Sequence, residues 1–534
     1  MFNYLPNPAR ILQAVVALAV THGIWWATSV AAHIVIICGA LLLLGKVTAP
    51  PSEGEAPLFE ANLDTEIPEA QIDHFDPGQT PIEPTELNTE TLSLVDPPQI
   101  DTDQPMSDSP DAVASGGSAA TGGIGGLDQF AVKALGPGPL VRGSGLAGAG
   151  TGRALGGGGA GSGFGARGDK DARKAMVGGY GGTKASERAV AAALNWLARH
   201  QSPDGSWSMD GFSQFCKGEP CSGPGTAKSD VAATAMALLP FLAAGQTHHT
   251  KGPYRRTIDL GIAWTINHQK QNGDLRDGAT MYTHGLAAIM LCEAYGLSKD
   301  SRVGLSAQAA IRFIEAAQNE TTGGWRYQPK DPGDTSVVGW QVMALKSAQM
   351  AGLSVDDAAM AGSHKWLKSV AHGASGGLFS YMKLSPATPA MTAVGLLCIQ
   401  YMGAKRQDPE IQEGMGYLMA HLPKAEAGNC YYWYYATQVM HNVPGPEWDT
   451  WNRDMRRVLI ESQVKDGCAA GSWDPDRPSK HPHGDQGGRI MVTSLCSLTL
   501  EVYYRYLPLY KLDAEDKPSS DPQQTASVKD KSDK

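Results

Sequence analysis

The sequence predicts an all-α domain made of six consecutive helix pairs. Apolar residues recur with the helical period, Gly-rich or polar turns separate the helices, and the same plan repeats from about residue 183 to residue 511. Within residues 335–351, Val337, Val338, Val342 and Leu345 fall on one apolar face. A helix pair of this kind cannot bury its apolar face alone, so six pairs that close on themselves would bury them all.

Each expected pair has a first helix, a turn and a more apolar second helix. The first helices are expected at 187–201, 257–269, 307–318, 362–371, 410–422 and 451–463, and the second at 230–245, 283–296, 335–349, 390–403, 431–442 and 488–504.

Charge is distributed unevenly along the 534 residues, whose formal net charge is −10. Residues 47–130 contain no Lys or Arg, whereas the later Gly-rich stretch carries several. No basic patch with interleaved aromatic residues appears, which excludes nucleic acid as an expected partner.

The segment 1–46 is predicted to anchor the chain in a membrane. Residues 24–45 are nearly all apolar and long enough to span a bilayer, and Trp25 and Trp26 suit an interfacial belt. No small-x-small cleavage site follows, so an uncleaved anchor is favoured over a signal peptide. The flanking charges and the acidic tract beyond predict a single pass through the cytoplasmic (inner) membrane, with the globular domain extracytoplasmic.

Two linkers and a tail are predicted around the helical domain. Residues 47–115 are acidic and Pro-rich, and residues 116–182 are Gly-rich, so both are expected to be disordered. Spacings such as GxGxxG occur there by composition and carry no weight for nucleotide binding. The helical domain is expected at 183–511 and a disordered tail at 512–534.

Cys216 and Cys221 lie in a short polar loop, FCKGEPC. In an extracytoplasmic domain they are a candidate disulfide. A metal site would need more ligands than this loop shows.

Three turns carry a Gln followed by Gly and Trp. These residues are Gln201, Gly205 and Trp207, then Gln318, Gly324 and Trp325, then Gln463, Gly471 and Trp473. The pattern resembles the QW repeats of squalene and other triterpene cyclases, whose fold protein prenyltransferase β-subunits share. The resemblance implies an α6/α6 toroid with six inner helices, six outer helices and a central cavity. We expect the Gln, Gly and Trp residues to join neighbouring repeats rather than to catalyse.

Proton-initiated triterpene cyclases carry an acidic D-x-D-D-T motif before an inner helix. Asp331, Gly333 and Asp334 stand at the matching place, with Gly333 where the family has its proton donor. Asp334, with Asp331 beside it, remains a candidate acid if burial raises its pKa; the alternative is that Asp334 caps the following helix. His284 is a third catalytic candidate, although a buried wall histidine is the commoner role.

Prenyltransferases hold zinc with Asp, Cys and His. Asp466 and Cys468, with His481 or His483, resemble that set. However, Asp466 and Cys468 fall inside a QW segment, whereas the Asp and Cys of those enzymes lie outside it. The histidine also follows Cys468 much more closely in sequence than the third ligand does in that family. A solvated loop is the favoured interpretation, and neither a metal nor another cofactor is expected.

In such a toroid the inner helices point their N-terminal ends towards one mouth of the cavity. The residues this nominates for the ligand cavity are Asp230, Tyr282, Trp340, Thr392, Tyr431, Tyr434, Tyr435 and Arg489. Aromatic walls stabilise cations in cyclases and also bind lipids or sugars without chemistry.

The favoured hypothesis is a membrane-anchored, cyclase-like toroid that binds a ligand or partner in its cavity without cyclisation. The alternative is an active terpenoid or isoprenoid cyclase or transferase that uses Asp334. A weaker alternative, a carbohydrate-active α6/α6 enzyme, needs paired carboxylates, for which Asp230 and Asp334 are the only nominees. The partners considered are the membrane, a lipid or isoprenoid, and an envelope protein or glycan.

Overall fold

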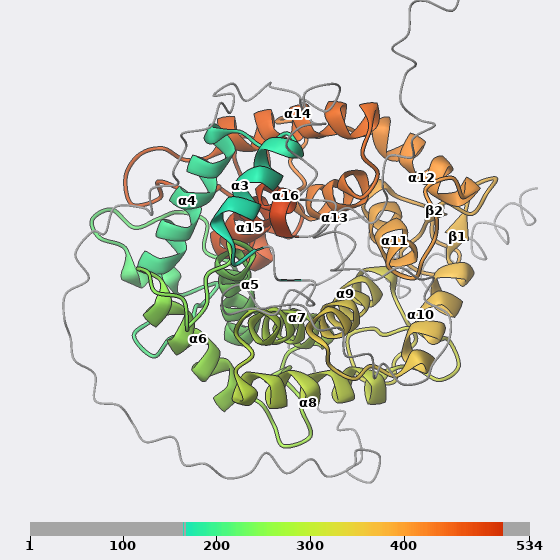
Figure 1. Ribbon diagram of the computed structural model, residues 1–534, viewed down its shortest axis with the longest axis horizontal. Helices are drawn as coiled ribbons and strands as arrows, with labels where there is room; N and C mark the ends of the chain where they lie inside the picture. Colours follow the sequence, from blue (N-terminus) through green and yellow to red (C-terminus); the bar gives the residue numbers. More distant parts are fainter. Residues whose placement is uncertain (1–163, 165–166, 506–534) are drawn as a thin grey trace, which may run out of the picture. The chain divides into compact units, whose positions relative to one another are not determined.

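Two concentric rings of helices make up the computed structural model, which describes Phe164 and residues 167–505 (Figure 1). The inner ring consists of α5 (Asp230–Ala243), α7 (Met281–Ser298), α9 (Thr335–Ala351), α11 (Pro389–Tyr401), α13 (Cys430–His441) and α15 (Gly484–Leu500). The outer ring consists of α4 (Lys184–Arg199), α6 (Arg255–Asn267), α8 (Ser301–Ala317), α10 (Asp357–Ser369), α12 (Pro409–Met419) and α14 (Pro446–Ser462). The prediction of six helix pairs is therefore confirmed.

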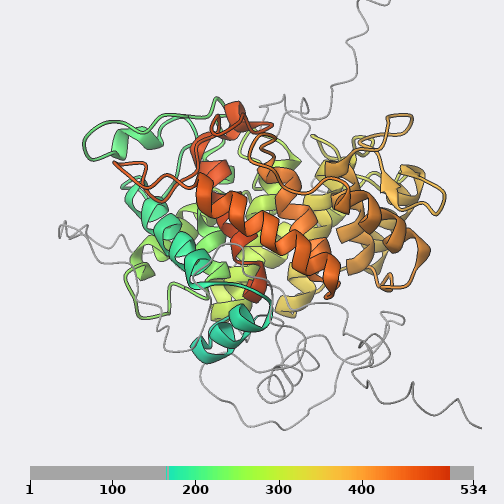
Figure 2. The ribbon, with the colours of Figure 1, turned by 90° about the horizontal axis from the view of Figure 1, so that it is seen from above.

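The inner ring is closed. Each inner helix contacts the next one in chain order, and α15 returns to contact α5; in the outer ring α14 likewise contacts α4. Figure 2 shows the same helices after a quarter turn, with α14 running across the front. The meeting of the first and last repeats replaces two open ends with one more repeat interface.

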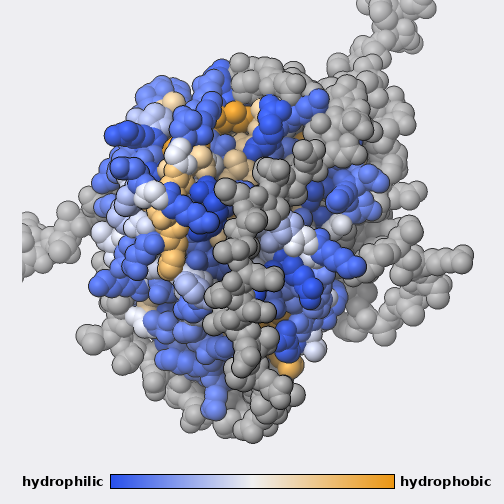
Figure 3. Space-filling view, turned by 90° about the vertical axis from the view of Figure 1, so that its left-hand side faces the viewer, coloured by the Kyte–Doolittle hydropathy of each residue, from blue (hydrophilic) through white to orange (hydrophobic). Residues whose placement is uncertain are grey.

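Burial explains the difference between the two rings. Every residue of α5 after Asp230 is buried, and α9 is buried over nearly its whole length, as expected for helices that are apolar all round. In contrast, α6 buries one stripe that includes Ile258 and Ile262 and exposes its charged residues. The face on the side of α4 and α6 is accordingly mainly hydrophilic (Figure 3).

Short polar side chains begin many of the helices. Thr183 forms a capping box at α4, and Thr280, Thr388 and Asn429 accept from first-turn N–H groups of α7, α11 and α13. Asp334 does the same at α9. These caps satisfy donors that have no partner inside the helix.

Each QW glutamine joins its own turn to the next outer helix. The amide nitrogen of Gln201 donates to Gly205 O at 2.9 Å and to Thr257 O of α6 at 2.9 Å. Gln463 repeats this across the ring closure, because it donates to Gly471 O and to Ala189 O of α4 at 2.8 Å. Gln318 makes the equivalent pair of bonds, and so does Gln269 in the turn between α6 and α7, which lacks the tryptophan.

The tryptophans of the same turns hold the preceding outer helix. The indole N–H groups of Trp207, Trp325 and Trp473 each donate at 2.8 Å to a carbonyl near the C-terminal end of α4, α8 and α14. All three rings are buried. Together with the glutamines, they connect three consecutive elements at each turn.

The glycine of the second QW turn differs from the one expected. Gly323, rather than Gly324, has the left-handed φ of 76° and lies against α10, where an added Cβ would come within 2.1 Å of Gly362 O. A Cβ on Gly471 would come similarly close to Ala192 O at the ring closure, at 2.2 Å. Gly324 stands where the other two turns have Ser206 and Ser472, and it lies against Gly333.

The start of the helical domain also needs correction. The Gly-rich linker was expected to reach residue 182, but α3 (Lys170–Gly179) begins well before that, capped by Asp169. Phe164 is fully buried and packs where a Cβ on Gly296 of α7 would fall. Arg167 is buried as well. The domain therefore includes apolar and charged residues that composition alone assigned to the linker.

The remaining described elements are small. They are the 3-10 helix η2 (Phe212–Phe215), strands β1 (Ala371–His372) and β2 (Leu378–Phe379), and α16 (Val502–Arg505). The strands are antiparallel, with Ala371 opposite Phe379. Within the described ranges, no helix is both long and apolar enough to cross a membrane. The expected anchor at 24–45, the linkers up to residue 163 and the tail from residue 512 lie outside those ranges.

Candidate functional site

Asp334 occupies the first position before α9 and has no exposed surface. Its Oδ1 atom accepts hydrogen bonds from Val337 N at 2.9 Å and from the Ser336 hydroxyl at 2.6 Å. Its Oδ2 atom accepts no hydrogen bond from a described residue, and Arg326 Nε lies 3.9 Å away. Asp334 therefore caps the helix with one oxygen, while the other has the long ion pair with Arg326 and no hydrogen bond from a described residue.

Burial raises the pKa of Asp334 to about 6, and the bonds from Ser336 and Val337 together with Arg326 lower it only in part. A carboxyl with this pKa can hold or release a proton near neutral pH. Burial of the carboxyl, rather than repulsion by a second carboxylate, raises the pKa of Asp334.

A cluster of aromatic residues from α7, α9 and α13 lies next to Asp334. We define the inner-ring aromatic cluster as Tyr282 of α7, Trp340 of α9 and Tyr431, Tyr434 and Tyr435 of α13. Trp340 stacks on Tyr434 with a centroid distance of 5.7 Å, and it meets Tyr435 edge-on at 5.3 Å. The Tyr282 hydroxyl contacts that of Ser336, which links the cluster to Asp334.

Several polar atoms of the cluster are buried without a partner. The indole nitrogen of Trp340 makes no hydrogen bond to a described residue, and the hydroxyls of Tyr431 and Tyr435 make none outside the cluster. Burial raises the pKa of both tyrosines well above its ordinary value, and the Asp334 carboxylate adds to the shift at Tyr431. Buried polar atoms are usually paired, so this group is unusual.

The proton-donor position of the cyclase motif cannot hold a side chain here. A Cβ on Gly333 would come within 2.8 Å of both Gly324 Cα and the Trp366 ring. Asp331, the first acid of the motif, accepts from the N–H of Gln328 at 3.1 Å and so closes a turn. Of the two catalytic aspartates expected from the sequence, only Asp334 is thus placed in the cluster.

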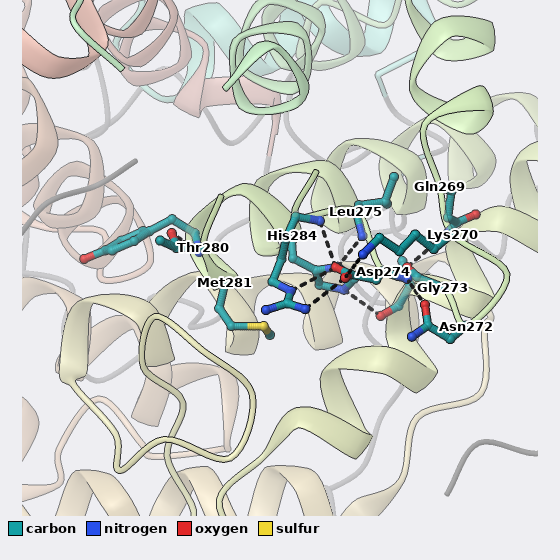
Figure 4. A network of polar contacts seen from close by, with 12 residues as sticks. Gln269, Lys270, Asn272, Gly273, Asp274, Leu275, Thr280, Met281 and His284 are labelled. Carbon is teal, nitrogen blue, oxygen red and sulfur yellow. Dashed lines mark hydrogen bonds and ion pairs between the residues drawn. The ribbon is translucent and has the colours of Figure 1, made fainter. Parts of the chain in front are cut away.

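His284 is fully engaged in structural bonds. Its Nδ1 accepts from Leu275 N at 3.1 Å, and Nε2 donates to Ala310 O of α8 at 2.9 Å. Burial lowers its pKa to about 4, so the ring is neutral. Figure 4 shows it beside Asp274, whose carboxylate is also held by Arg276. His284 therefore connects the second turn to α8 and has no free nitrogen for proton transfer.

Other nominated residues are dispersed. Asp230 and Asp334 begin α5 and α9, which α7 separates, so they do not form the carboxylate pair of a glycosidase. Thr392 accepts a hydrogen bond from Phe379 N, which fixes β2 on α11. The Tyr434 hydroxyl accepts from Arg505.

A buried ion-pair network lies on α7. The Glu293 carboxylate accepts from Arg167 Nη1 at 2.6 Å and from Arg505 Nη2 at 2.9 Å, and all three side chains are buried. Although burial alone would raise the pKa of Glu293, the two guanidinium groups lower it. The network ties the first and last described segments to the inner ring.

The candidate disulfide is not formed, because Cys216 and Cys221 are both free cysteines. Both thiols instead turn towards His200 and Cys468, and the four ligand atoms lie within 4.8 Å of one another. His481 accepts from Cys430 N at 3.0 Å. The prenyltransferase-like set is therefore not assembled, and Cys468 belongs to a different group of residues.

A pocket of about 390 Å³ adjoins the ring closure. Its lining residues are Ser222, Ser462, Val464, Ala469, Asp474, Arg477, Pro478 and Arg489. Arg489 pairs with Asp474 at 2.6 Å and donates to Ser222 and Ser472. Arg489 was nominated for the ligand cavity, but its role here is to hold the first and last repeats together.

The comparison with protein families gives one match. Residues 177–295 match the squalene-hopene cyclase C-terminal domain. The resemblance inferred from the QW turns is thus confirmed over the first two helix pairs. No curated protein matches the chain.

Among solved structures, the type II terpene cyclase MstE from Scytonema, in complex with geranylgeranyl dihydroxybenzoate, matches at 14% identity and a TM-score of 0.41, over 61% of this chain and 98% of its own. An inactive α-1,6-mannanase variant of Salegentibacter in complex with α-1,6-mannotriose matches at 10% identity and a TM-score of 0.42, over 60% and 99%. A GH76 α-mannanase of Bacteroides thetaiotaomicron matches at 11% identity and a TM-score of 0.42, over 60% and 95%. Similarity at this level does not indicate an activity for this chain.

Proposed function

We propose that this protein is a membrane-anchored, cyclase-like toroid that binds an isoprenoid-type lipid at the inner-ring aromatic cluster without cyclising it. The anchor at 24–45 remains a sequence prediction. The observation that carries the binding proposal is a set of buried polar atoms that have no hydrogen-bond partner among the described residues, namely Asp334 Oδ2, Trp340 Nε1 and the hydroxyls of Tyr431 and Tyr435.

An amphiphilic ligand would satisfy both parts of this site. Its polar end group would pair with the unpaired atoms, which otherwise cost about 1 to 3 kcal/mol each when buried. Its apolar chain would pack on the rings of Trp340, Tyr434 and Tyr435, which provide large apolar area. An isoprenoid alcohol has this combination of groups.

The packing at Gly333 argues against the reaction of the cyclase family. The donor of that family is an Asp at this position, and there is no room for one against Gly324 and Trp366. One observation favours the active alternative, since the pKa of Asp334, about 6, would let this carboxyl act as an acid. That reaction would need Asp334 to replace the missing donor.

The binding proposal is tested by titrating the full chain, kept in detergent, with a prenyl alcohol while tryptophan fluorescence is followed. We expect saturable binding that weakens about fivefold in Tyr435→Phe, because one hydrogen bond is worth about 1 kcal/mol. Tyr254→Phe is the matched control, since Tyr254 is buried at the start of α6 against Phe241 and away from the cluster.

Equal affinities for the wild type and both variants would contradict this placement of the ligand. Conversion of an added polyene to a cyclic product, lost in Asp334→Asn, would establish the active alternative.

A further inference from the structure

The first and last repeats bring one histidine and three cysteines together at the ring closure. His200 follows α4, Cys216 and Cys221 lie in the loop between α4 and α5, and Cys468 lies in the turn between α14 and α15. His200 Nε2 lies 3.4 Å from Cys216 Sγ, 3.6 Å from Cys221 Sγ and 3.5 Å from Cys468 Sγ. We propose that these four side chains form a structural zinc site that closes the ring.

The distances fit a tetrahedral ion. With zinc–sulfur and zinc–nitrogen bonds of about 2.3 and 2.1 Å, the nitrogen and each sulfur of a tetrahedron are about 3.6 Å apart. Hydrogen bonding alone does not account for the arrangement, because one lone pair on His200 Nε2 cannot accept from three thiols at once. A single cation at the centre is bound by all four atoms.

The imidazole of His200 has the tautomer and the orientation that a zinc ligand needs. His200 has no exposed surface, and its Nδ1 lies 2.7 Å from Trp196 O, so Nδ1–H donates and the lone pair stays on Nε2. A backbone carbonyl on the far nitrogen is the usual way in which proteins orient a zinc-bound histidine. The Trp196 ring packs against the His200 ring at a tilt of 31°, with centroids 4.4 Å apart, and so restricts the orientation of the imidazole.

The loop and its surroundings also suit a thiolate site. Cys216 and Cys221 are separated by four residues, which falls within the usual spacing of zinc ligands. The backbone N–H of Cys221 donates to Cys216 Sγ at 3.2 Å, a contact that stabilises a thiolate. Arg199 donates to Cys468 O at 3.4 Å and to Ala470 O at 3.1 Å, so a cation lies beside a site whose net charge would be −1.

Four protein ligands leave no open position, which is typical of structural rather than catalytic zinc. This set differs from that of the prenyltransferases, since Asp466 is not a member and three of the four ligands come from the first repeat. The ion would join segments about 270 residues apart in sequence, as the separation of 268 between His200 and Cys468 shows.

The test uses the full chain purified in detergent without chelators and in a reducing buffer. Elemental analysis should give one zinc per chain, and the content should fall several-fold in Cys468→Ser and in His200→Ala. Cys398→Ser is the matched control, because Cys398 is a buried free cysteine of α11 outside the cluster, and it should keep its zinc. Removal of the zinc should lower the melting temperature of the wild type and leave that of Cys468→Ser unchanged.

A second measurement does not depend on the variants folding. Replacement of the ion by cobalt(II) in the wild type should give the intense visible bands of a tetrahedral site and thiolate-to-cobalt charge-transfer bands. A chain that binds neither zinc nor cobalt would overturn the proposal. A native Cys216–Cys221 disulfide, detected by peptide mapping, would also overturn it.

Discussion

The hydroxyl of Ser336 donates a 2.6 Å hydrogen bond to one oxygen of Asp334, whereas the other oxygen of that carboxyl accepts none from the described residues. The contact of Tyr282 with the same serine extends this pair into the aromatic cluster. Asp334 is thus both the cap of α9 and, through Ser336, a neighbour of Tyr282 in the cluster.

The raised pKa of Asp334 makes the stability of the protein depend on pH. Burial raises this pKa from 3.8 to about 6. The stabilisation that comes from the proton on this carboxyl is therefore complete below the ordinary pKa and is lost as the pH rises through about 6. Between about pH 4 and pH 7 the free energy of unfolding should fall by up to about 3 kcal/mol relative to Asp334→Asn. Urea unfolding at a series of pH values measures the difference.

Asn is the matched replacement because it keeps the acceptor for Val337 N but does not ionise. If the free energies of unfolding of the wild type and Asp334→Asn differed by the same amount at every pH in this series, burial would not raise the pKa of Asp334.

The Gly333→Asp substitution restores the motif of the cyclases but should destabilise the protein. Its Cβ would come within 2.8 Å of Gly324 Cα and Trp366, and overpacking of this kind costs about 1 to 3 kcal/mol. Chemical unfolding at neutral pH measures this loss. Gly416→Ala on the exposed face of α12, where an added Cβ meets nothing within 4 Å, should have no such cost. A stable Gly333→Asp protein would contradict the packing argument.

The ring closure depends on the close approach of Gly471 to α4. Gly471→Ala combines a left-handed φ of 95° with a Cβ only 2.2 Å from Ala192 O. Gly467→Ala, in the same turn, has a φ of 69° and no neighbour within 4 Å. We expect the second to cost about 1 kcal/mol and the first about 1 to 3 kcal/mol more. Equal melting temperatures for the two variants would be inconsistent with a tight closure.

Glu293→Gln should be among the most destabilising substitutions. It leaves the buried guanidinium groups of Arg167 and Arg505 without their shared carboxylate, which costs about 3 to 5 kcal/mol. Because the pKa of Glu293 is lowered, its contribution is present above the ordinary pKa of 4.5 and is lost as the pH falls through the lowered value.

Glu320→Gln provides the comparison, since Glu320 pairs with Lys330 at the surface and is 83% exposed. Surface pairs contribute about 0 to 1 kcal/mol. If thermal unfolding of the two variants gave similar losses, the buried network would not have the importance assigned to it.

The helical repeat was predictable because its evidence is local. The period of apolar residues around Val337 and the Gln, Gly and Trp of each turn are visible within a few tens of residues. The cap at Asp334 was predictable for the same reason, since an Asp before an apolar helix is a local pattern.

The relationships that join distant segments could not be predicted in this way. Arg167 lies in a Gly-rich stretch whose composition indicates a linker, yet its partner Glu293 is 126 residues away. His200 and Cys468 are even further apart in sequence. The C-x-x-x-x-C spacing of Cys216 and Cys221 was the one local sign of the metal-ligand group, and on its own it favoured a disulfide over a metal site.

Native mass spectrometry of the full chain, purified in detergent from the cells that produce it, tests the central claim most directly. We predict a bound species in the mass range of isoprenoid lipids that is lost in Trp340→Ala. It should be kept in Trp264→Ala, which removes an indole of outer helix α6 that bonds to Asp204. A chain without any bound lipid, or the same lipid on both variants, would contradict a lipid site at the inner-ring aromatic cluster.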